Sequence, residues 1–139
     1  MVAMTRAHIA DPDIVRKTAA GHPEQVRPCI GCNQACIGHF HAGYPISCIQ
    51  YPETGRELTL AAGKTPTIHK KKILIAGGGP AGMKAASVLA RRGHHVTLCE
   101  ATSQFGGQAL LAQMLPGRAE FGGIITNLAR EMELAGVDV

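Results

Sequence analysis

Four cysteines constrain this chain more than any other feature of its sequence. Cys29, Cys32, Cys36 and Cys48 have the spacing C-x2-C-x3-C-x11-C, so three thiols fall in one tight loop and the fourth returns after a short excursion. This arrangement is typical of a [4Fe–4S] cluster, whose irons are bound by cysteine thiolates. We therefore predict that these four cysteines are the ligands of an iron–sulfur cluster.

Two other uses of the four cysteines stay open. A structural zinc site is the main rival, although zinc ligands usually come as two compact pairs. Disulfides are the third possibility, but they require an oxidising compartment, and the first ten residues show no secretory signal pattern. The sequence thus predicts a reducing, cytoplasmic location. The fifth cysteine, Cys99, lies in an apolar run and is predicted to be a buried core thiol.

Composition and charge limit the kinds of partner. The chain is 45% hydrophobic and 17% charged, which is typical of a globular protein, and no apolar run is long enough to span a bilayer. The only basic run, at residues 70–72, comes directly before a predicted strand, and aromatic residues that could stack on bases make up only 4% of the chain. We expect a small-molecule substrate and neither a nucleic-acid nor a membrane partner.

The first part of the chain predicts little regular structure. Residues 2–6 have the pattern of a short strand, and Asp11 followed by Pro12 is typical of a helix start, with the helix running to about Ala20. An irregular segment with the four cysteines follows. Residues 55–70, rich in glycine, threonine and proline, are predicted as a linker.

The second part alternates between strand and helix patterns, which indicates an α/β fold with a parallel sheet. The predicted elements are a buried strand at residues 73–76, a helix with Pro80 in its first turn, a strand at residues 96–99, an amphipathic helix from Phe121 to Gly136, and a third strand beginning at residues 137–139. Both ends of the chain resemble interrupted elements, so we expect it to be an internal portion of a longer protein.

A glycine motif lies between the first predicted strand and its helix. Gly77-Gly78-Gly79-Pro80-Ala81-Gly82 satisfies G-x-G-x-x-G, and Glu100 ends the following strand. In this context Gly77 allows a tight turn, Gly79 lets the backbone approach a pyrophosphate, and Gly82 lets the helix pack closely on the strand. The helix N-terminus favours phosphate, and Glu100 can accept hydrogen bonds from ribose hydroxyls. The motif predicts a dinucleotide site.

The choice between FAD and NAD depends on a second glycine turn. Gly106, Gly107 and Gln108 follow the acid closely, where their backbone could lie along the same nucleotide. A second such loop resembles the nucleotide-binding domains of flavoprotein disulfide reductases more than those of simple NAD dehydrogenases. We therefore predict FAD, with residues 77, 79–82, 100, 107 and 108 as its candidate contacts.

The order of these motifs resembles the bacterial 2,4-dienoyl-CoA reductase and trimethylamine dehydrogenase family, an old-yellow-enzyme-like group. The resemblance is carried by Met4-Thr5-Arg6, by Ile9-Ala10-Asp11-Pro12, by the cysteine block with its eleven-residue return, and by the glycine motif. It implies four parts: the C-terminal end of an FMN-bearing (β/α)8 barrel at residues 1–22, an iron–sulfur segment at 23–54, the linker at 55–70, and the first βαβ part of a Rossmann-like FAD/NAD(P)-binding domain at 71–139.

The resemblance also implies a function. Residues 2–6 would be the last strand of the barrel, with Arg6 binding the FMN phosphate. NAD(P)H would reduce FAD, and electrons would pass singly through the cluster to FMN and then to an enoyl thioester or a similar unsaturated substrate. Some family members instead oxidise amines. The barrel pocket and its proton donor are absent from this sequence, so no catalytic acid can be named, and we expect this chain alone to be inactive.

Two further hypotheses belong to other classes. The chain could be a stand-alone electron-transfer module or a zinc-stabilised binding module. It could also resemble the small subunit of glutamate synthase, which places iron–sulfur cysteines before a flavin motif. That relative would need a further set of cysteines, which this sequence lacks.

Overall fold

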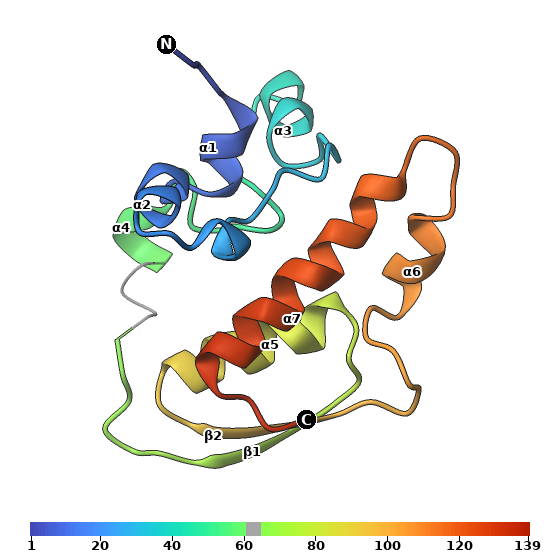
Figure 1. Cartoon of the computed structure of the whole chain (residues 1–139). Helices are drawn as coiled ribbons and strands as arrows, with labels where there is room; N and C mark the ends of the chain where they lie inside the picture. The colour runs from blue at the N-terminus through green and yellow to red at the C-terminus, as the bar shows by residue number, and fades with distance from the viewer. Residues whose placement is uncertain (61–64) are drawn as a thin grey trace. The chain divides into compact units, whose positions relative to one another are not determined.

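The computed structural model describes residues 1–60 and 65–139 (Figure 1). The chain divides into two compact units, Met1–Ala62 and Gly63–Val139. The first unit is built from short helices and irregular segments, and the second from a small parallel sheet with helices. Across residues 1–60 and 65–139, no helix combines the length and apolar character needed to cross a bilayer.

The regular structure described in the first unit consists of short helical segments. They are α1 (Arg6–Ala10), α2 (Ile14–Ala19), the 3-10 turn η1 (Pro23–Gln25), α3 (Ile37–His41) and α4 (Glu57–Leu60). Residues 26–36 and 42–56, which carry all four cysteines, belong to no helix or strand. The predicted cysteine segment is therefore largely irregular, but it contains helix α3, which was not predicted. The predicted linker contains α4, and its residues 61–64 lie outside the described residues.

The strand predicted at residues 2–6 is wrong. Residues 1–4 have no regular structure, and Arg6 is the first residue of helix α1. A strand needs a neighbour for its backbone hydrogen bonds, and no described strand of the first unit offers one. The stretch from Arg6 to Ala10 instead satisfies its backbone locally, as in the Ile9 N–H bond to the carbonyl of Thr5 at 3.2 Å.

The predicted helix to about Ala20 is present as α2, but Asp11 does not cap it directly. The helix begins at Ile14, and Ala20 is its C-terminal cap. The carboxylate of Asp11 accepts the N–H of Asp13 at 3.1 Å, one residue before the helix. Asp11 therefore shapes the corner between α1 and α2 rather than the first turn of α2.

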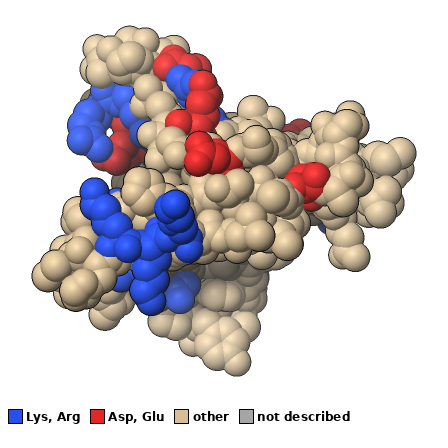
Figure 2. Space-filling model, turned by 90° about the horizontal axis from the view of Figure 1, so that it is seen from below, with Lys and Arg blue, Asp and Glu red and all other residues tan. Residues whose placement is uncertain are grey.

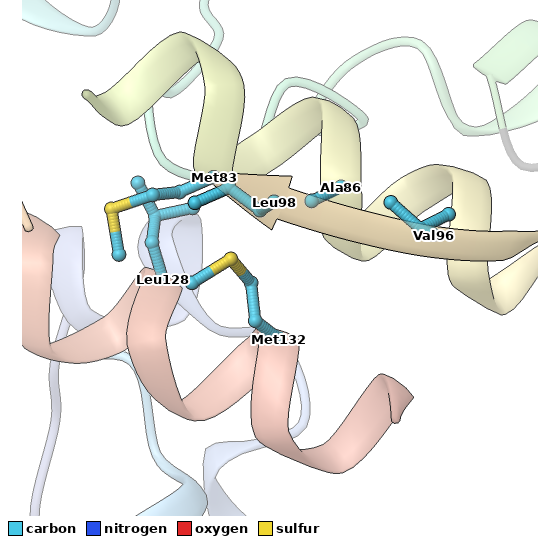
Figure 3. Packing of buried hydrophobic residues seen from close by; sticks show 6 residues of the cluster. All are labelled: Met83, Ala86, Val96, Leu98, Leu128 and Met132. Atoms are coloured by element: carbon cyan, nitrogen blue, oxygen red, sulfur yellow. The ribbon is translucent and has the colours of Figure 1, made fainter. Parts of the chain in front are cut away.

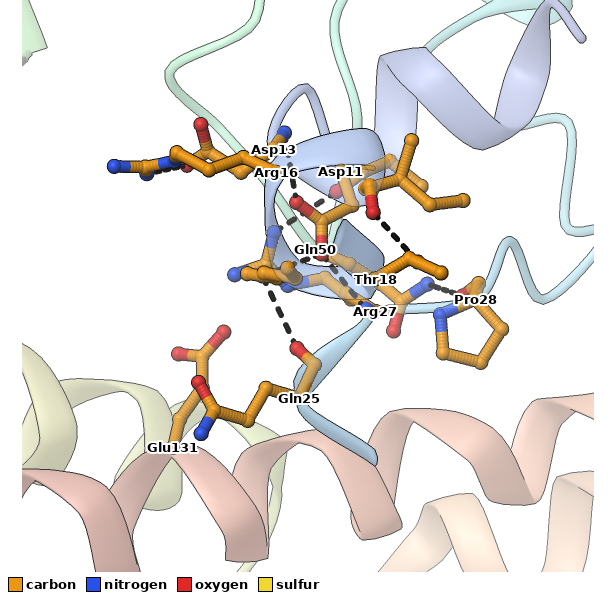
Figure 4. A network of polar contacts seen from close by, with 12 residues as sticks. Asp11, Asp13, Arg16, Thr18, Gln25, Arg27, Pro28, Gln50 and Glu131 are labelled. Carbon is orange, nitrogen blue, oxygen red and sulfur yellow. Dashed lines mark hydrogen bonds and ion pairs between the residues drawn. The ribbon is translucent and has the colours of Figure 1, made fainter. Parts of the chain in front are cut away.

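Asp11 is the centre of a buried polar network in the first unit (Figure 4). Only 1% of its surface is exposed. Its carboxylate accepts the backbone N–H of Arg27 at 2.8 Å and is paired with the ammonium group of Lys17, which also donates to the carbonyl of Gln25 at 3.0 Å. Arg27 in turn donates to the carbonyl of Ala10 at 2.8 Å. The network fastens the chain just before the cysteines to the α1–α2 corner.

The network also sets the protonation of Asp11. Burial by itself raises the pKa of this carboxyl group, but the Lys17 ammonium and the amide N–H groups of Arg27 and Asp13 more than offset it, so the pKa lies below its usual value. Asp11 is therefore a buried carboxylate that is paired and hydrogen-bonded, as a buried charge must be.

The second unit is a two-stranded parallel sheet with a helical crossover. Strands β1 (Lys72–Ala76) and β2 (His95–Cys99) pair with Ile73 opposite Val96, and α5 (Pro80–Arg91) connects them. The chain continues through α6 (Gln108–Ala112), η3 (Ala119–Gly122) and α7 (Gly123–Ala135). The predicted order of strands and helices is confirmed, with α6 as an additional helix that was not predicted. The prediction that the first strand is buried is wrong, because only Ile73 and Ile75 pack on the core and Leu74 is 71% exposed. Where a third strand was predicted, the described structure has a single parallel bridge, between Thr97 of β2 and Asp138.

The core of the second unit lies between one face of the sheet and helices α5 and α7 (Figures 1 and 3). Its buried apolar side chains come from both helices and from β2: Met83, Ala86, Val96, Leu98, Leu128 and Met132. Burial alternates along β2, so Val96 and Leu98 face the helices while Thr97 and Cys99 point away. The prediction that Cys99 is a buried core thiol is therefore wrong, because it has the parity of the open face.

On the face that Figure 2 shows, lysine and arginine side chains gather in clusters rather than spread evenly. Lys70, Lys71 and Lys72 are all exposed, as expected for a solvated entry into β1. The chain just after α5 lies beside this run, since the N–H of Lys71 donates to Nδ1 of His94 at 3.2 Å.

Candidate functional site

The four predicted cluster ligands line a single pocket in the first unit. Cys29, Cys32, Cys36 and Cys48 are all partly buried around it. Apolar side chains, including those of Ile9, Ile30, Ala35 and Ile49, also line the pocket. Among the described residues, no three His, Cys, Asp or Glu side chains are close enough together to hold one metal ion. The thiols thus surround a space rather than converge on one point.

The loop between Cys29 and Cys36 directs backbone donors at sulfur. The N–H of Gly31 donates to the sulfur of Cys29 at 3.4 Å, and the N–H of Gln34 hydrogen-bonds to Cys32. Burial raises the pKa of Cys32, the Gln34 amide lowers it, and Cys36, Cys48 and Cys29 raise it further because like charges repel; the net shift is upward. Backbone N–H···S bonds of this kind are among the features that tune iron–sulfur clusters.

Arg6 also lines this pocket. Its Nη1 donates to the Oδ1 of Asn33 at 3.0 Å, which joins the start of α1 to the loop between the second and third cysteines. A guanidinium has five N–H donors, so this bond leaves donors for the phosphate predicted from the family resemblance. Asn33 was not predicted from the sequence. The signal that could have indicated it is an asparagine directly after a predicted cysteine ligand, because asparagine tolerates the left-handed backbone found there (φ 56°).

The glycine motif of the second unit forms the turn from β1 into α5. A Cβ atom on Gly82 would lie 2.1 Å from the carbonyl oxygen of Gly77 and 3.5 Å from a methyl group of Ile75, so glycine is required where the helix meets the strand. A Cβ on Gly79 would meet nothing within 4 Å. The space beside Gly79 is therefore open at the N-terminus of α5, whose first amides have no partner within the helix. Pro80 and Ala81 form its first turn.

Glu100 lies at the end of β2 and holds the turn together. Its carboxylate accepts the N–H of Gly78 at 2.6 Å, the N–H of Thr102 at 2.9 Å and the hydroxyl of Thr102 at 3.0 Å. The Thr102 amide, followed by the Gly78 amide and the Thr102 hydroxyl, lowers the pKa of Glu100, which is thus ionised at neutral pH. The sequence analysis did not foresee that Gly78 and Thr102 would orient this acid.

The second glycine turn lies directly against the first. The N–H of Gly106 donates to the carbonyl of Gly78 at 2.8 Å, and a Cβ atom on Gly107 would lie 3.5 Å from the Cα of Gly79. Gln108 begins α6. The structure therefore brings together at one place the candidate contacts that the sequence analysis drew from the two separate turns and from the end of β2.

A pocket of about 380 Å³ opens beside this assembly at the carboxyl end of β2. Glu100, Thr102, Phe105 and Val139 are among its lining residues, and so is the exposed Cys99. In open α/β sheets the crevice beyond the carboxyl ends of the strands is the usual ligand site. The open space at Gly79, the tight Gly82 and the ionised acid suit a dinucleotide.

Comparisons with known proteins found a family model for part of this chain and relatives that match nearly all of it. A family model described as FAD dependent oxidoreductase matches residues 72–133. The chain is 45% identical over 138 residues to a metal reductase of Desulforamulus reducens, covering 99% of this chain and 20% of that protein. It is 43% identical over 141 residues to an N,N-dimethylglycine/sarcosine dehydrogenase of Chromohalobacter salexigens, covering 100% of this chain and 20% of that protein. The chain belongs to the 2,4-dienoyl-CoA reductase and trimethylamine dehydrogenase family.

The structure of a family member resembles this one closely. A 2-naphthoyl-CoA reductase, solved with 2-naphthoyl-CoA, superposes with a TM-score of 0.90 at 32% identity, covering 97% of this chain and 20% of that one. The family members matched here are flavin-dependent oxidoreductases. This chain spans about a fifth of the length of the curated relatives it matches.

Proposed function

We propose that this chain carries the iron–sulfur segment and part of the FAD-binding domain of a flavin-dependent oxidoreductase. Cys29, Cys32, Cys36 and Cys48 would hold a [4Fe–4S] cluster, and the observation that carries this proposal is that all four thiols line one largely apolar pocket. The cluster would supply one-electron steps between two flavins. The cysteine spacing and the backbone N–H groups of Gly31 and Gln34 near sulfur support it.

The nucleotide site would bind FAD. Gly79 and the first turn of α5 would receive the pyrophosphate, Gly77 and Gly82 would shape the turn, and Glu100 would accept the ribose hydroxyls. The contact between the two glycine turns supports FAD, because Gly107 lies against Gly79, where the pyrophosphate would bind, and Gln108 follows it at the start of α6. NAD(P)H would be the source of electrons for this flavin.

The electron path and its end point extend beyond this chain. Electrons would pass from FAD through the cluster to FMN, with Arg6 at the FMN phosphate and residues 1–22 at the end of the FMN barrel, while the remainder of the polypeptide would supply the barrel and the nicotinamide site. Residues 23–54, 55–70 and 71–139 would be the cluster segment, the linker and the nucleotide domain. The reductase found by structural similarity favours an enoyl thioester or a similar unsaturated substrate.

A second candidate is amine oxidation within the same family. It is favoured by the 43% identity to a dehydrogenase named for N,N-dimethylglycine and sarcosine. The two candidates run electrons in opposite directions. Anaerobic assays of the protein that contains this chain would separate them: NAD(P)H oxidation with enoyl thioesters supports the reductase, and flavin reduction by N-methylated amines supports the dehydrogenase.

The cluster itself is tested by composition. Anaerobically purified protein should contain iron and acid-labile sulfide in equal amounts, with a broad brown absorbance. Changing any one of the four pocket cysteines to serine should lower both contents, whereas Cys99→Ser, which alters a thiol of the other unit, should leave them unchanged. Stoichiometric zinc without sulfide would refute the cluster and favour the zinc-stabilised module.

A further inference from the structure

Arg6 differs from every other residue in the lining of the thiol pocket. Apart from the four cysteines, its side chain is the only ionisable one that the structure describes in that lining, and the remaining residues are apolar or neutral. A guanidinium keeps its positive charge at every physiological pH. A permanent cation thus stands beside a pocket whose four thiolates would carry negative charge.

Asn33 holds this cation in place. It is the only non-glycine residue with positive φ among residues 1–60 and 65–139, at 56°, and its carbonyl accepts the N–H of Gly38 at 2.8 Å at the start of α3. Such a backbone conformation costs free energy and persists only where the surroundings fix it. In this conformation Oδ1 of Asn33 accepts a hydrogen bond from Nη1 of Arg6 at 3.0 Å. Asn33 directly follows Cys32 in the sequence, so the bond holds Arg6 next to a predicted ligand.

We propose that Arg6, positioned by Asn33, raises the reduction potential of the cluster. The inference rests on the proposed function, because it requires a cluster in this pocket. A cluster held by these cysteines would take up one electron from a reduced flavin with no bond formed or broken, and its negative charge would increase by one. A nearby guanidinium stabilises the more negative state, and the apolar side chains around the thiols reduce screening by water. Arg6 would bond no iron and would act on the cluster through its charge alone.

The test is an anaerobic redox titration of the protein that contains this chain, followed by the electron paramagnetic resonance signal of the reduced cluster. Arg6→Gln should shift the midpoint potential to a more negative value. Arg6→Lys, which keeps the charge, should give a smaller shift. Asn33→Gly, which tolerates the left-handed backbone but lacks the side-chain acceptor, should shift the potential in the same direction. In the double variant the two shifts should not add, because both act through one contact.

Arg16→Gln is the matched control. It removes one positive charge from the same unit, but Arg16 is largely exposed, pairs with Asp13 at 2.8 Å, and does not line the pocket. Its midpoint potential should equal that of the parent. Iron and sulfide contents are measured on every variant, so a parent without a cluster refutes the proposed function rather than this inference.

Three results would overturn the inference. They are an unchanged or more positive potential in Arg6→Gln with full iron content, equal shifts in Arg6→Gln and Arg16→Gln, and fully additive shifts in the double variant. Should Arg6→Gln lose its cluster, Arg6→Lys and Asn33→Gly decide the question. A potential equal to that of the parent in Asn33→Gly then contradicts the proposal.

Discussion

Two glycines of the same turn should respond differently to alanine. Gly82→Ala should lower the stability of the second unit, whereas Gly79→Ala should lower FAD retention and leave stability nearly unchanged. In Gly82→Ala the new Cβ would lie 2.1 Å from a backbone carbonyl oxygen, so helix α5 has to move away by about 1 Å to reach a tolerable contact. Overpacking of this kind costs about 1–3 kcal/mol, and we expect the upper part because the obstacle is backbone. Because alanine has a higher helix propensity than glycine, the substitution also stabilises α5 by up to about 1 kcal/mol. The free energy of unfolding should therefore fall by about 2 kcal/mol.

In Gly79→Ala the new Cβ meets no atom within 4 Å, and φ is −73°, which any residue adopts. Alanine is a poorer N-cap than glycine but restricts the unfolded chain, and these small effects oppose each other. Stability without FAD should therefore stay within about 0.5 kcal/mol of the parent. FAD retention should nevertheless fall, and Gly79→Val should abolish it, because the side chain occupies the space where a pyrophosphate approaches.

Thermal denaturation of FAD-free protein, monitored by circular dichroism, measures the change in stability. For a domain of this size about 2 kcal/mol lowers Tm by roughly 8–16 °C in Gly82→Ala, while Gly79→Ala should melt with the parent. Flavin absorbance after gel filtration measures how much FAD each variant retains. Unchanged stability in Gly82→Ala would refute the close packing of α5 on β1, and full FAD content in Gly79→Val would show that the motif is only a turn.

The remaining predictions concern the two structural carboxylates. Asp11→Asn should destabilise the first unit by about 3 kcal/mol, because it leaves the Lys17 ammonium without its buried counter-charge. The pKa of Asp11 is lowered by folding, so its contribution is complete above the unfolded pKa of about 3.9 and is lost as pH falls through the lower folded pKa. In denaturant melts the free energy of unfolding of the parent should thus approach that of Asp11→Asn as the pH is lowered. A difference in unfolding free energy that stays constant down to pH 2 would contradict this. Glu100→Ala should weaken FAD retention less than Gly79→Val does, and it should loosen the loop at Thr102, visible as faster amide exchange.

The second unit was predictable from sequence because its signals agree at every level. Strand β1 is a short apolar run, α5 begins at Pro80 next to the glycine motif, and the apolar residues of α7 recur with helical period. Local propensity, turn chemistry and burial pattern all favour the same elements. The exceptions were helix α6, which was not predicted, and the burial of Cys99 and Leu74, which are both exposed. An apolar run shows that a strand is present but does not fix which of its alternate residues face the core.

The first unit was less predictable because its structure depends on contacts between distant residues. The Arg6–Asn33 bond spans 27 positions and the Arg27–Asp11 bond spans 16, and neither has a periodic signal. The strand expected at residues 2–6 relied on a short residue pattern, and the described part of the first unit contains no strand that could pair with it. Its pattern was too short to outweigh the local hydrogen bonds of α1.

The two units are stabilised by different interactions. The second unit has a continuous apolar core formed by helices and sheet. In the first unit the fully buried hydrophobic residues that the structure describes are only Ala10, Ile30 and Ala35, and the deepest polar group is the carboxylate of Asp11. So small an apolar core seldom stabilises a unit of this size without help. Metal binding by a folded site contributes directly to folding free energy. The proposed cluster would therefore stabilise the first unit as well as carry electrons, while the Asp11 network fixes the corner of chain that presents Arg6 to it.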